Sequence, residues 1–243
     1  MRYYAIGDIH GQLDMLRAAH RRIEADRDLT GDRDAPVIHL GDLVDRGPDV
    51  RGVLDFLLQG RDAGRPWQVI KGNHDRMFTR FVRSGRMHDN QIKSGRSWLD
   101  PALGGTATLA SYGITASEAD PGAAYSAAQA AVPEAHLAFI EGLPLYIETE
   151  KVLFVHAGIE PRAPLDWQTE DNLLWIRDGF LDWQADHPWL VVHGHTALHA
   201  PQHFGNRVDL DSGAGYGRPL SAAVIEDRDV WVLSDKGRIA LVP

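Results

Sequence analysis

The feature that most constrains this chain is a strand–turn–helix unit that occurs three times in its first third. The three strand-like apolar runs span residues 3–6, 36–40 and 67–70. Apolar residues at helical spacing follow each run and predict helices over about 12–26, from 50 onward and over 74–83. Continuous apolar runs that alternate with amphipathic helices are typical of parallel strands buried on both faces. The sequence therefore predicts an α/β fold.

Each of these three strands ends in a glycine followed by a short oxygen-bearing side chain, namely Asp8, Asp42 and Asn73. Ligands of parallel α/β sheets bind beyond the carboxyl ends of the strands, so these side chains should face the same rim. A single Gly-Asp or Gly-Asn pair is often only a turn or a helix cap. Three such pairs at successive strand ends favour a binding site.

The rest of the chain predicts more strands and one insertion. Runs at 152–155 and 189–192 end in histidine clusters, and short runs at 207–210, 222–225, 230–233 and 239–242 predict antiparallel strands with tight turns. Residues of about 85–145 are rich in Ala, Gly and Ser, which predicts a small, mostly helical insertion. Within it a helix should start near Pro133 and end at Gly142. Because no linker interrupts the pattern, residues 1–243 are predicted to form a single domain.

Composition narrows the chemistry and the partners. The chain has twelve histidines, no cysteine and a formal net charge of −9. Without cysteine there is no disulfide, no thiolate zinc finger and no cysteine nucleophile. The acidic balance argues against nucleic acid and anionic membranes as partners, because both are polyanions. The start of the chain carries no targeting signal, and no apolar run is long enough to span a membrane, so a cytoplasmic location is expected.

The strand ends together carry a donor set typical of divalent cations. Its members are Asp8, His10, Asp42, Asn73, His74, His156 and His195. Oxygen and nitrogen donors of this kind suit Mn, Fe, Zn or Mg. The set is too large for one tetrahedral ion, but it suits two ions bridged by a carboxylate, as in sites that act on phosphoryl groups. By contrast, His20 and His39 lie in apolar patterns and are predicted to be core residues, and Trp98 and Trp175 are expected to serve packing.

Five blocks of the sequence resemble the calcineurin-like metallophosphoesterases and, within them, the bacterial phosphoprotein phosphatases. The blocks are Gly7-Asp8-Ile9-His10-Gly11, Gly41-Asp42-Leu43-Val44-Asp45-Arg46-Gly47, Gly72-Asn73-His74-Asp75, His156-Ala157-Gly158 and Gly194-His195-Thr196. They follow the order of the family and span most of the chain. The resemblance implies the fold of the family, a two-sheet β-sandwich flanked by helices in α/β/β/α layers.

The resemblance also implies a role for each matching residue. Two divalent metal ions would be held by Asp8, His10, Asp42, Asn73, His156 and His195, with Asp42 bridging both. A metal-bridging hydroxide would attack the phosphorus, while His74, oriented by Asp45, would protonate the leaving oxygen as general acid. Arg46, Asn73 and Arg177 would hold the phosphoryl oxygens. Manganese is the expected metal, with iron, zinc or magnesium as alternatives.

Arg177 is assigned less directly than the other site residues. It lies in the segment 173–178, which resembles the family segment whose arginine grips the phosphate. The planar guanidinium can contact two phosphoryl oxygens at once, which suits this role. The alternative is a surface ion pair with a neighbour such as Asp178.

The substrate is less narrowly implied than the superfamily. Asp45 before Arg46 resembles the protein phosphatases, since symmetrical diadenosine tetraphosphate hydrolases usually carry Ala there, whereas Asp75 is closer to the hydrolase pattern. The segments 104–113 and 211–216 look like those of bacterial serine/threonine phosphatases.

The predicted function is therefore a metal-dependent phosphomonoesterase of the serine/threonine protein phosphatase type. Its substrate would be a phosphorylated protein or a small phosphoester. One alternative is a diadenosine tetraphosphate hydrolase or small-molecule phosphoesterase, and another is a metal-retaining binding module without turnover. A nuclease of the same superfamily is disfavoured, because the acidic chain offers no basic track for a nucleic-acid backbone.

Overall fold

Two mixed sheets form the centre of the molecule, in a computed structural model that describes residues 1–243. The first sheet has the order β11 (Gly237–Ala240), β10 (Asp229–Ser234), β9 (Ala222–Glu226), β1 (Arg2–Ile6), β2 (Val37–His39), β3 (Trp67–Val69). The second has the order β4 (Tyr146–Glu148), β5 (Val152–Val155), β6 (Leu190–His193), β8 (Arg207–Asp209), β7 (Gln202–His203). Neighbouring strands pair within each sheet, and the inner faces of the sheets meet in a shared core.

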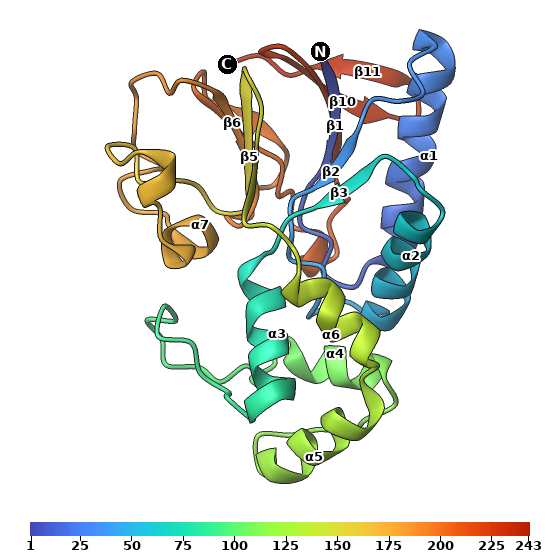
Figure 1. Ribbon diagram of the computed structural model, residues 1–243, viewed down its shortest axis with the longest axis vertical. Coiled ribbons are helices and arrows are strands. Elements are labelled where there is room, and N and C mark those ends of the chain that lie inside the picture. Colours follow the sequence, from blue (N-terminus) through green and yellow to red (C-terminus); the bar gives the residue numbers. More distant parts are fainter.

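Seven α-helices surround the sheets (Figure 1). They are α1 (Leu13–Thr30), α2 (Val50–Asp62), α3 (Asn73–Ser84), α4 (Gly105–Ser111), α5 (Pro121–Ala131), α6 (Glu134–Glu141) and α7 (Glu170–Trp175). Figure 1 shows α1 and α2 outside the first sheet, α7 beyond the second, and α3 to α6 together below the sheets. Two short 3₁₀ turns, Leu165–Trp167 and Ala214–Tyr216, complete the regular structure. This is the layered α/β arrangement expected from the sequence. None of these helices combines the length and the apolar character needed to cross a membrane.

Alternation along the strands divides the core between the two faces of the first sheet. Ala5 of β1 packs in the layer between the sheets with Phe154 of β5 and Val192 of β6. Its neighbours Tyr4 and Ile6 point the other way, into the core beneath α1 and α2. Each large side chain buried in this way contributes about 1.5–3 kcal/mol. The two cores fix the strand ends at one shared rim.

Strand directions confirm one part of the prediction and correct another. β1, β2 and β3 run parallel, and β9, β10 and β11 are antiparallel, both as expected. The antiparallel strand predicted at 207–210 is antiparallel on one side only, because β8 pairs parallel with β6 in the interior of the second sheet. The antiparallel partner of β8 is the two-residue edge strand β7. β7 and β8 therefore form a hairpin, whereas β6, the parallel neighbour of β8, precedes that hairpin in the sequence.

The predicted insertion is only partly helical. The helix expected between Pro133 and Gly142 is α6, and α4 and α5 also lie in the insertion. Residues 85–104, however, form turns and loops with no helix or strand. Buried polar contacts fix part of this stretch: Asp89, for example, accepts hydrogen bonds from Arg76 on α3. The assignment of the whole chain to one domain stays a prediction.

Candidate metal centre and active site

The rim between the two sheets collects side chains from the ends of six strands. They are Asp8 after β1, Asp42 after β2, Asn73 after β3, His156 after β5, His195 after β6 and Asp211 after β8. All six are buried. A cleft of about 650 Å³ opens onto this rim, and its lining includes Asp8, Asp42, Arg46, Asn73, His74, Arg177 and His195. The structure thus brings the predicted site residues together. His10, Asp45 and His156 do not line the cleft but contact Asp42, His74 and Asn73, which do.

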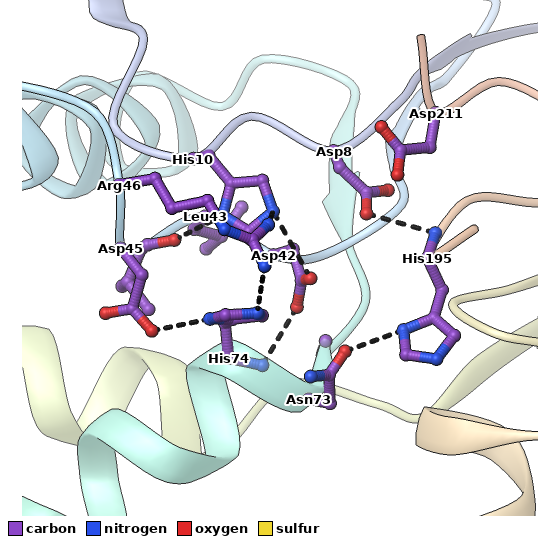
Figure 2. A network of polar contacts seen from close by, with 12 residues as sticks. Asp8, His10, Asp42, Leu43, Asp45, Arg46, Asn73, His74, His195 and Asp211 are labelled. Carbon is purple, nitrogen blue, oxygen red and sulfur yellow. Dashed lines mark hydrogen bonds and ion pairs between the residues drawn. The ribbon is translucent and has the colours of Figure 1, made fainter. Parts of the chain in front are cut away.

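Asp42 lies at the centre of the group (Figure 2). Its Oδ2 atom is 3.5 Å from Nε2 of His10, and its Oδ1 atom is 3.4 Å from Nε2 of His156. Oδ1 also accepts a hydrogen bond from the backbone N–H of His74 at 2.9 Å. One carboxylate therefore faces imidazoles on two sides, which is the arrangement that a bridging ligand requires.

A second set of donors surrounds Asn73. Its Oδ1 atom lies 2.9 Å from Nε2 of His156 and 2.8 Å from Nδ1 of His195. The donor atoms of Asp42, His156 and His195 all lie within 4.8 Å of one another. The Nδ1 atom of His156 donates to the carbonyl of Leu40 at 2.8 Å, so in the neutral ring the Nε2 lone pair faces the oxygen of Asn73. Two acceptors that face each other fit a cation between them.

Two further atoms at the rim that could ligate a metal are buried without a hydrogen-bond partner. They are Oδ1 of Asp8 and Nε2 of His195. The other oxygen of Asp8 accepts from the backbone N–H of His195 at 3.0 Å. Gly194 leaves room for this carboxylate, since a Cβ there would lie 2.0 Å from Oδ1 of Asp8. Orphaned buried acceptors are rare, because burying a polar group without a partner is costly. The donor set therefore fits divalent cations.

Burial also sets the protonation of the donors. Burial, followed by the charge of Arg46, lowers the pKa of His10 well below its usual value. Burial and then His156 lower the pKa of His195 in the same way. Burial acts to raise the pKa of Asp42, but the imidazoles, that of His156 foremost, outweigh it and hold that pKa below its usual range. Neutral imidazole and ionised carboxylate are the forms that bind cations.

His10 is oriented by the loop after β2. Its Nδ1 atom donates to the carbonyl of Val44 at 2.8 Å, which turns Nε2 toward Asp42. Nη1 of Arg46 donates to the same Nε2 atom at 2.6 Å, and Nη2 of Arg46 donates to Nε2 of His74 at 3.1 Å. The guanidinium thus lies between the two imidazoles and lines the cleft.

His74 forms a close pair with Asp45. The Nδ1 atom of His74 donates to Oδ2 of Asp45 at 2.6 Å, and both side chains are buried. Because a carboxylate only accepts, Nδ1 carries the proton, and Nε2 accepts from Arg46, which lines the cleft together with His74. His74 also belongs to a second group of close donor atoms with His10 and Asp42. Distance alone therefore admits His74 both as a ligand and as a proton donor.

Strained backbone concentrates at this rim. Six non-glycine residues have a positive φ, and five of them are His10, Asp42, Asp45, Arg46 and His195. Each such residue costs on the order of 1–3 kcal/mol and persists only where its surroundings fix it. Asp75 supplies part of that support, since its carboxylate accepts from the backbone N–H groups of Leu43 at 2.9 Å and Gly72 at 2.8 Å. Burial, followed by the charge of Asp42, raises the pKa of Asp75 to about 7.

Arg177 reaches the cleft from the loop after α7. Its Nη2 atom donates to the backbone carbonyl of His195 at 3.3 Å, and burial lowers its pKa. It makes no ion pair with Asp178, which pairs instead with Lys93 at 3.2 Å. The structure therefore favours the cleft over the surface ion pair as the place of Arg177.

The sequence patterns missed several residues that contact the site. Asp211 lines the cleft and lies beside Asp8 in Figure 2. Burial, followed by the charges of Asp211 and Asp42, raises the pKa of Asp8 well above its usual value. Asp211 lies two residues after β8, as Asp8 lies two residues after β1. The strand Arg207–Asp209 is not apolar and no glycine precedes Asp211, so the Gly-Asp pattern does not identify it. Trp98 and Thr108 both donate hydrogen bonds to Asp45, and no local pattern predicts these contacts.

Comparison with known proteins decides the family. The family model for calcineurin-like phosphoesterases matches residues 1–225. The chain belongs to that family. It is 27% identical over 238 residues to serine/threonine-protein phosphatase 1 of Salmonella typhimurium, covering 92% of this chain and 91% of that protein. It is also 24% identical to an asymmetrical bis(5'-nucleosyl)-tetraphosphatase, PrpE of Bacillus cereus, covering 91% of this chain and 89% of that protein.

Solved structures agree on the fold of this calcineurin-like phosphoesterase. A candidate diadenosine tetraphosphatase superimposes with a TM-score of 0.65 at 24% identity, covering 99% of this chain and 94% of that one. A cold-active protein-tyrosine phosphatase of Shewanella superimposes with a TM-score of 0.61 at 18% identity, covering 99% and 80%. The family and the layered fold predicted from the five sequence blocks are thus confirmed.

Proposed function

We propose that this calcineurin-like phosphoesterase is a dinuclear-metal-dependent phosphatase that hydrolyses phosphomonoesters, of the serine/threonine protein phosphatase type. The observation that carries the proposal is the position of Asp42, whose two oxygens face His10 and His156. One metal ion would be held by Asp8, His10 and Asp42, and the other by Asp42, Asn73, His156 and His195. Manganese is the proposed metal.

Bound divalent ions would supply an activated water as nucleophile and would neutralise charge that develops on the phosphoryl group. The chain itself supplies the remaining contacts. Arg46 and Arg177, which lie far apart in the sequence, both line the cleft. Their planar guanidinium groups suit the binding of phosphoryl oxygens. Asn73 also lines the cleft, and its amide oxygen contacts His156 and His195. These residues would hold the phosphate in one orientation.

His74 would act as the general acid. His74 lines the cleft, where a leaving oxygen needs a proton, and its Nδ1 atom is held by Asp45. Its Nε2 atom, which accepts from Arg46 in this structure, would carry the proton that is donated. A carboxylate at Nδ1 fixes the ring orientation and stabilises the protonated imidazole that donates. The alternative use of His74 as a metal ligand predicts loss of metal on its substitution, which distinguishes the two roles.

One second candidate is supported by a specific feature of the cleft. Beyond the metal ligands the cleft is lined by Ile92, Trp175 and Tyr216, and Tyr216 is 60% exposed. Aromatic faces of this kind can stack on nucleobases. Together with the PrpE relatives, they make hydrolysis of a dinucleoside tetraphosphate the alternative to a phosphoprotein substrate.

The test compares turnover of a chromogenic phosphomonoester and a phosphodiester, with manganese and after chelation. The proposal predicts manganese-dependent hydrolysis that favours the monoester. A panel of phosphoserine, phosphothreonine and phosphotyrosine peptides beside diadenosine tetraphosphate then ranks the substrate classes. Metal binding without turnover of any of these compounds would contradict the proposal and support a binding module.

A further inference from the structure

We infer that Trp98 and Thr108 are positioning residues that hold Asp45, and through it His74, in the orientation needed for proton transfer. The inference rests on the proposed function, in which His74 is the general acid. Both residues belong to the Ala/Gly/Ser-rich insertion of residues 85–145. The insertion would therefore take part in the reaction by fixing the Asp45–His74 pair.

Both carboxylate oxygens of Asp45 accept hydrogen bonds from identified side chains. Nε1 of Trp98 donates to Oδ2 of Asp45 at 2.8 Å, the same oxygen that accepts from His74 at 2.6 Å. Oγ1 of Thr108 donates to the other oxygen, Oδ1, at 2.6 Å. The Thr108 hydroxyl also accepts from the backbone N–H of Asp45 at 2.9 Å. Two donors from the insertion thus fix the plane of the carboxylate against rotation.

Trp98 is itself held by the helix that carries His74. Its ring is fully buried and packs against Phe78 and Phe81 of α3, with ring centroids 5.9 and 4.7 Å away. α3 begins at Asn73, so the same helix places the imidazole and the aromatic rings that seat Trp98. The tryptophan thus links Asp45, by a hydrogen bond, to the helix that carries His74, by packing.

The insertion also holds the strained backbone at Asp45 and Arg46. Both residues have a positive φ, of 72° and 67°. The backbone N–H of Arg46 donates to the carbonyl of Gly104 at 3.2 Å. A Cβ at Gly104 would lie 2.3 Å from that nitrogen, so only glycine allows this approach. The turn that orients Asp45 toward His74 therefore packs against Gly104 of the insertion.

Removing either donor should loosen the pair without touching the metal ligands. Substitution of residues that orient a functional group from behind typically costs about 10–100-fold in activity. We expect Trp98→Phe and Thr108→Val each to lower kcat about 10-fold for substrates with poor leaving groups, and far less for good leaving groups that need no acid. KM should stay unchanged, because neither residue contacts the cleft. Thr108→Ser retains the hydroxyl and should restore the wild-type rate.

The experiment measures kcat and KM for aryl phosphates of graded leaving-group pKa, with His74→Asn and Asp45→Asn as references. Trp231→Phe and Thr149→Val are the matched controls, because they remove the same groups at sites remote from Asp45. A second readout needs no activity and uses the zinc-loaded protein, because paramagnetic manganese beside His74 would broaden the signal. The low-field proton resonance of the His74 Nδ1–H group, identified by its loss in His74→Asn, should shift in Trp98→Phe and Thr108→Val.

The outcomes separate this inference from the proposed function. If wild type hydrolyses aryl phosphates, but both variants keep its leaving-group dependence and its low-field resonance, the positioning role is wrong. A uniform loss of rate across leaving groups, or failure of Thr108→Ser to restore it, would likewise contradict the inference. If wild type has no phosphatase activity, the proposed function fails, and the resonance still tests whether Trp98 and Thr108 orient the pair.

Discussion

Two buried histidine clusters in this protein resemble each other in burial but differ in their neighbours. At the rim, His10 and His156 flank the carboxylate of Asp42 beside an open cleft. In the core, Nε2 of His20 lies 3.1 Å from Nε2 of His39. Aromatic rings surround this second pair, with the Trp67 ring centroid 4.2 Å from that of His20. Buried histidines alone therefore do not indicate a metal site, whereas oxygen donors between them and access from a cleft do.

Substitution of Asp42 should give the largest difference between the clusters. Asp42→Asn removes the charge between the two donor groups, so we expect loss of at least one metal ion and a drop in kcat of more than about 10³-fold. His20→Phe should leave metal content and kcat near wild type, since the core cluster has no part in the site. Metal analysis of the purified variants and initial rates measure both effects. Full activity in Asp42→Asn would contradict the bridging role.

His74 tests whether every histidine at the rim is a ligand. His74→Asn should keep both metal ions and should slow substrates with poor leaving groups by about 10²-fold or more, because general acids contribute on that scale. The leaving-group series and metal analysis are the measurements. Loss of a metal ion in this variant would instead make His74 a ligand, and an equal loss for all leaving groups would remove its acid role.

Substitution of Arg177 tests whether a residue that is not a metal ligand contributes to phosphate binding. Arg177→Ala should raise KM and weaken inhibition by inorganic phosphate about 10-fold, because a hydrogen bond to a charged group contributes about 1.5–3 kcal/mol. Metal content should not change. Arg177→Lys is the matched variant, which keeps the charge but loses the planar fork. Unchanged phosphate inhibition in Arg177→Ala would place this residue outside the substrate site.

The core cluster should have its effect on stability, not activity. Burial, followed by His39, lowers the pKa of His20 to about 2, and burial lowers the pKa of His39 to about 4. Both rings stay neutral in the folded chain and protonate near pH 6.5 when unfolded, so the unfolded state binds more protons below about pH 6.5. The free energy of unfolding should therefore be undiminished above that pH and fall as the pH drops toward 4.

The slope of this decline is at most about 1.4 kcal/mol per pH unit for each histidine. Denaturant unfolding of wild type and His20→Phe between pH 7 and 4.5 measures it. His20→Phe should lose less stability over this range, because phenylalanine fits the aromatic surroundings and cannot protonate. An identical pH dependence in the two proteins would show that His20 is not kept neutral by the fold.

Local sequence patterns were enough to predict those site residues that directly follow parallel strands. Asp8, Asp42 and Asn73 meet because β1, β2 and β3 are parallel and end at one edge. The parallel pairing of β8 was not predictable from local pattern, since its neighbour β6 lies beyond the β7 hairpin. Contacts to Asp45 from Trp98 and Thr108 were hidden for a similar reason. They join residues 53 and 63 positions apart and depend on how the insertion packs.

The central claim is that Asp42 lies between two metal ions. Titration of the chain with manganese, followed by metal analysis and electron paramagnetic resonance, tests it most directly. We expect two ions per chain, with the altered spectrum of a spin-coupled pair that the Asp42→Asn variant loses. One ion per chain, or two that give only the spectrum of isolated manganese, would contradict it.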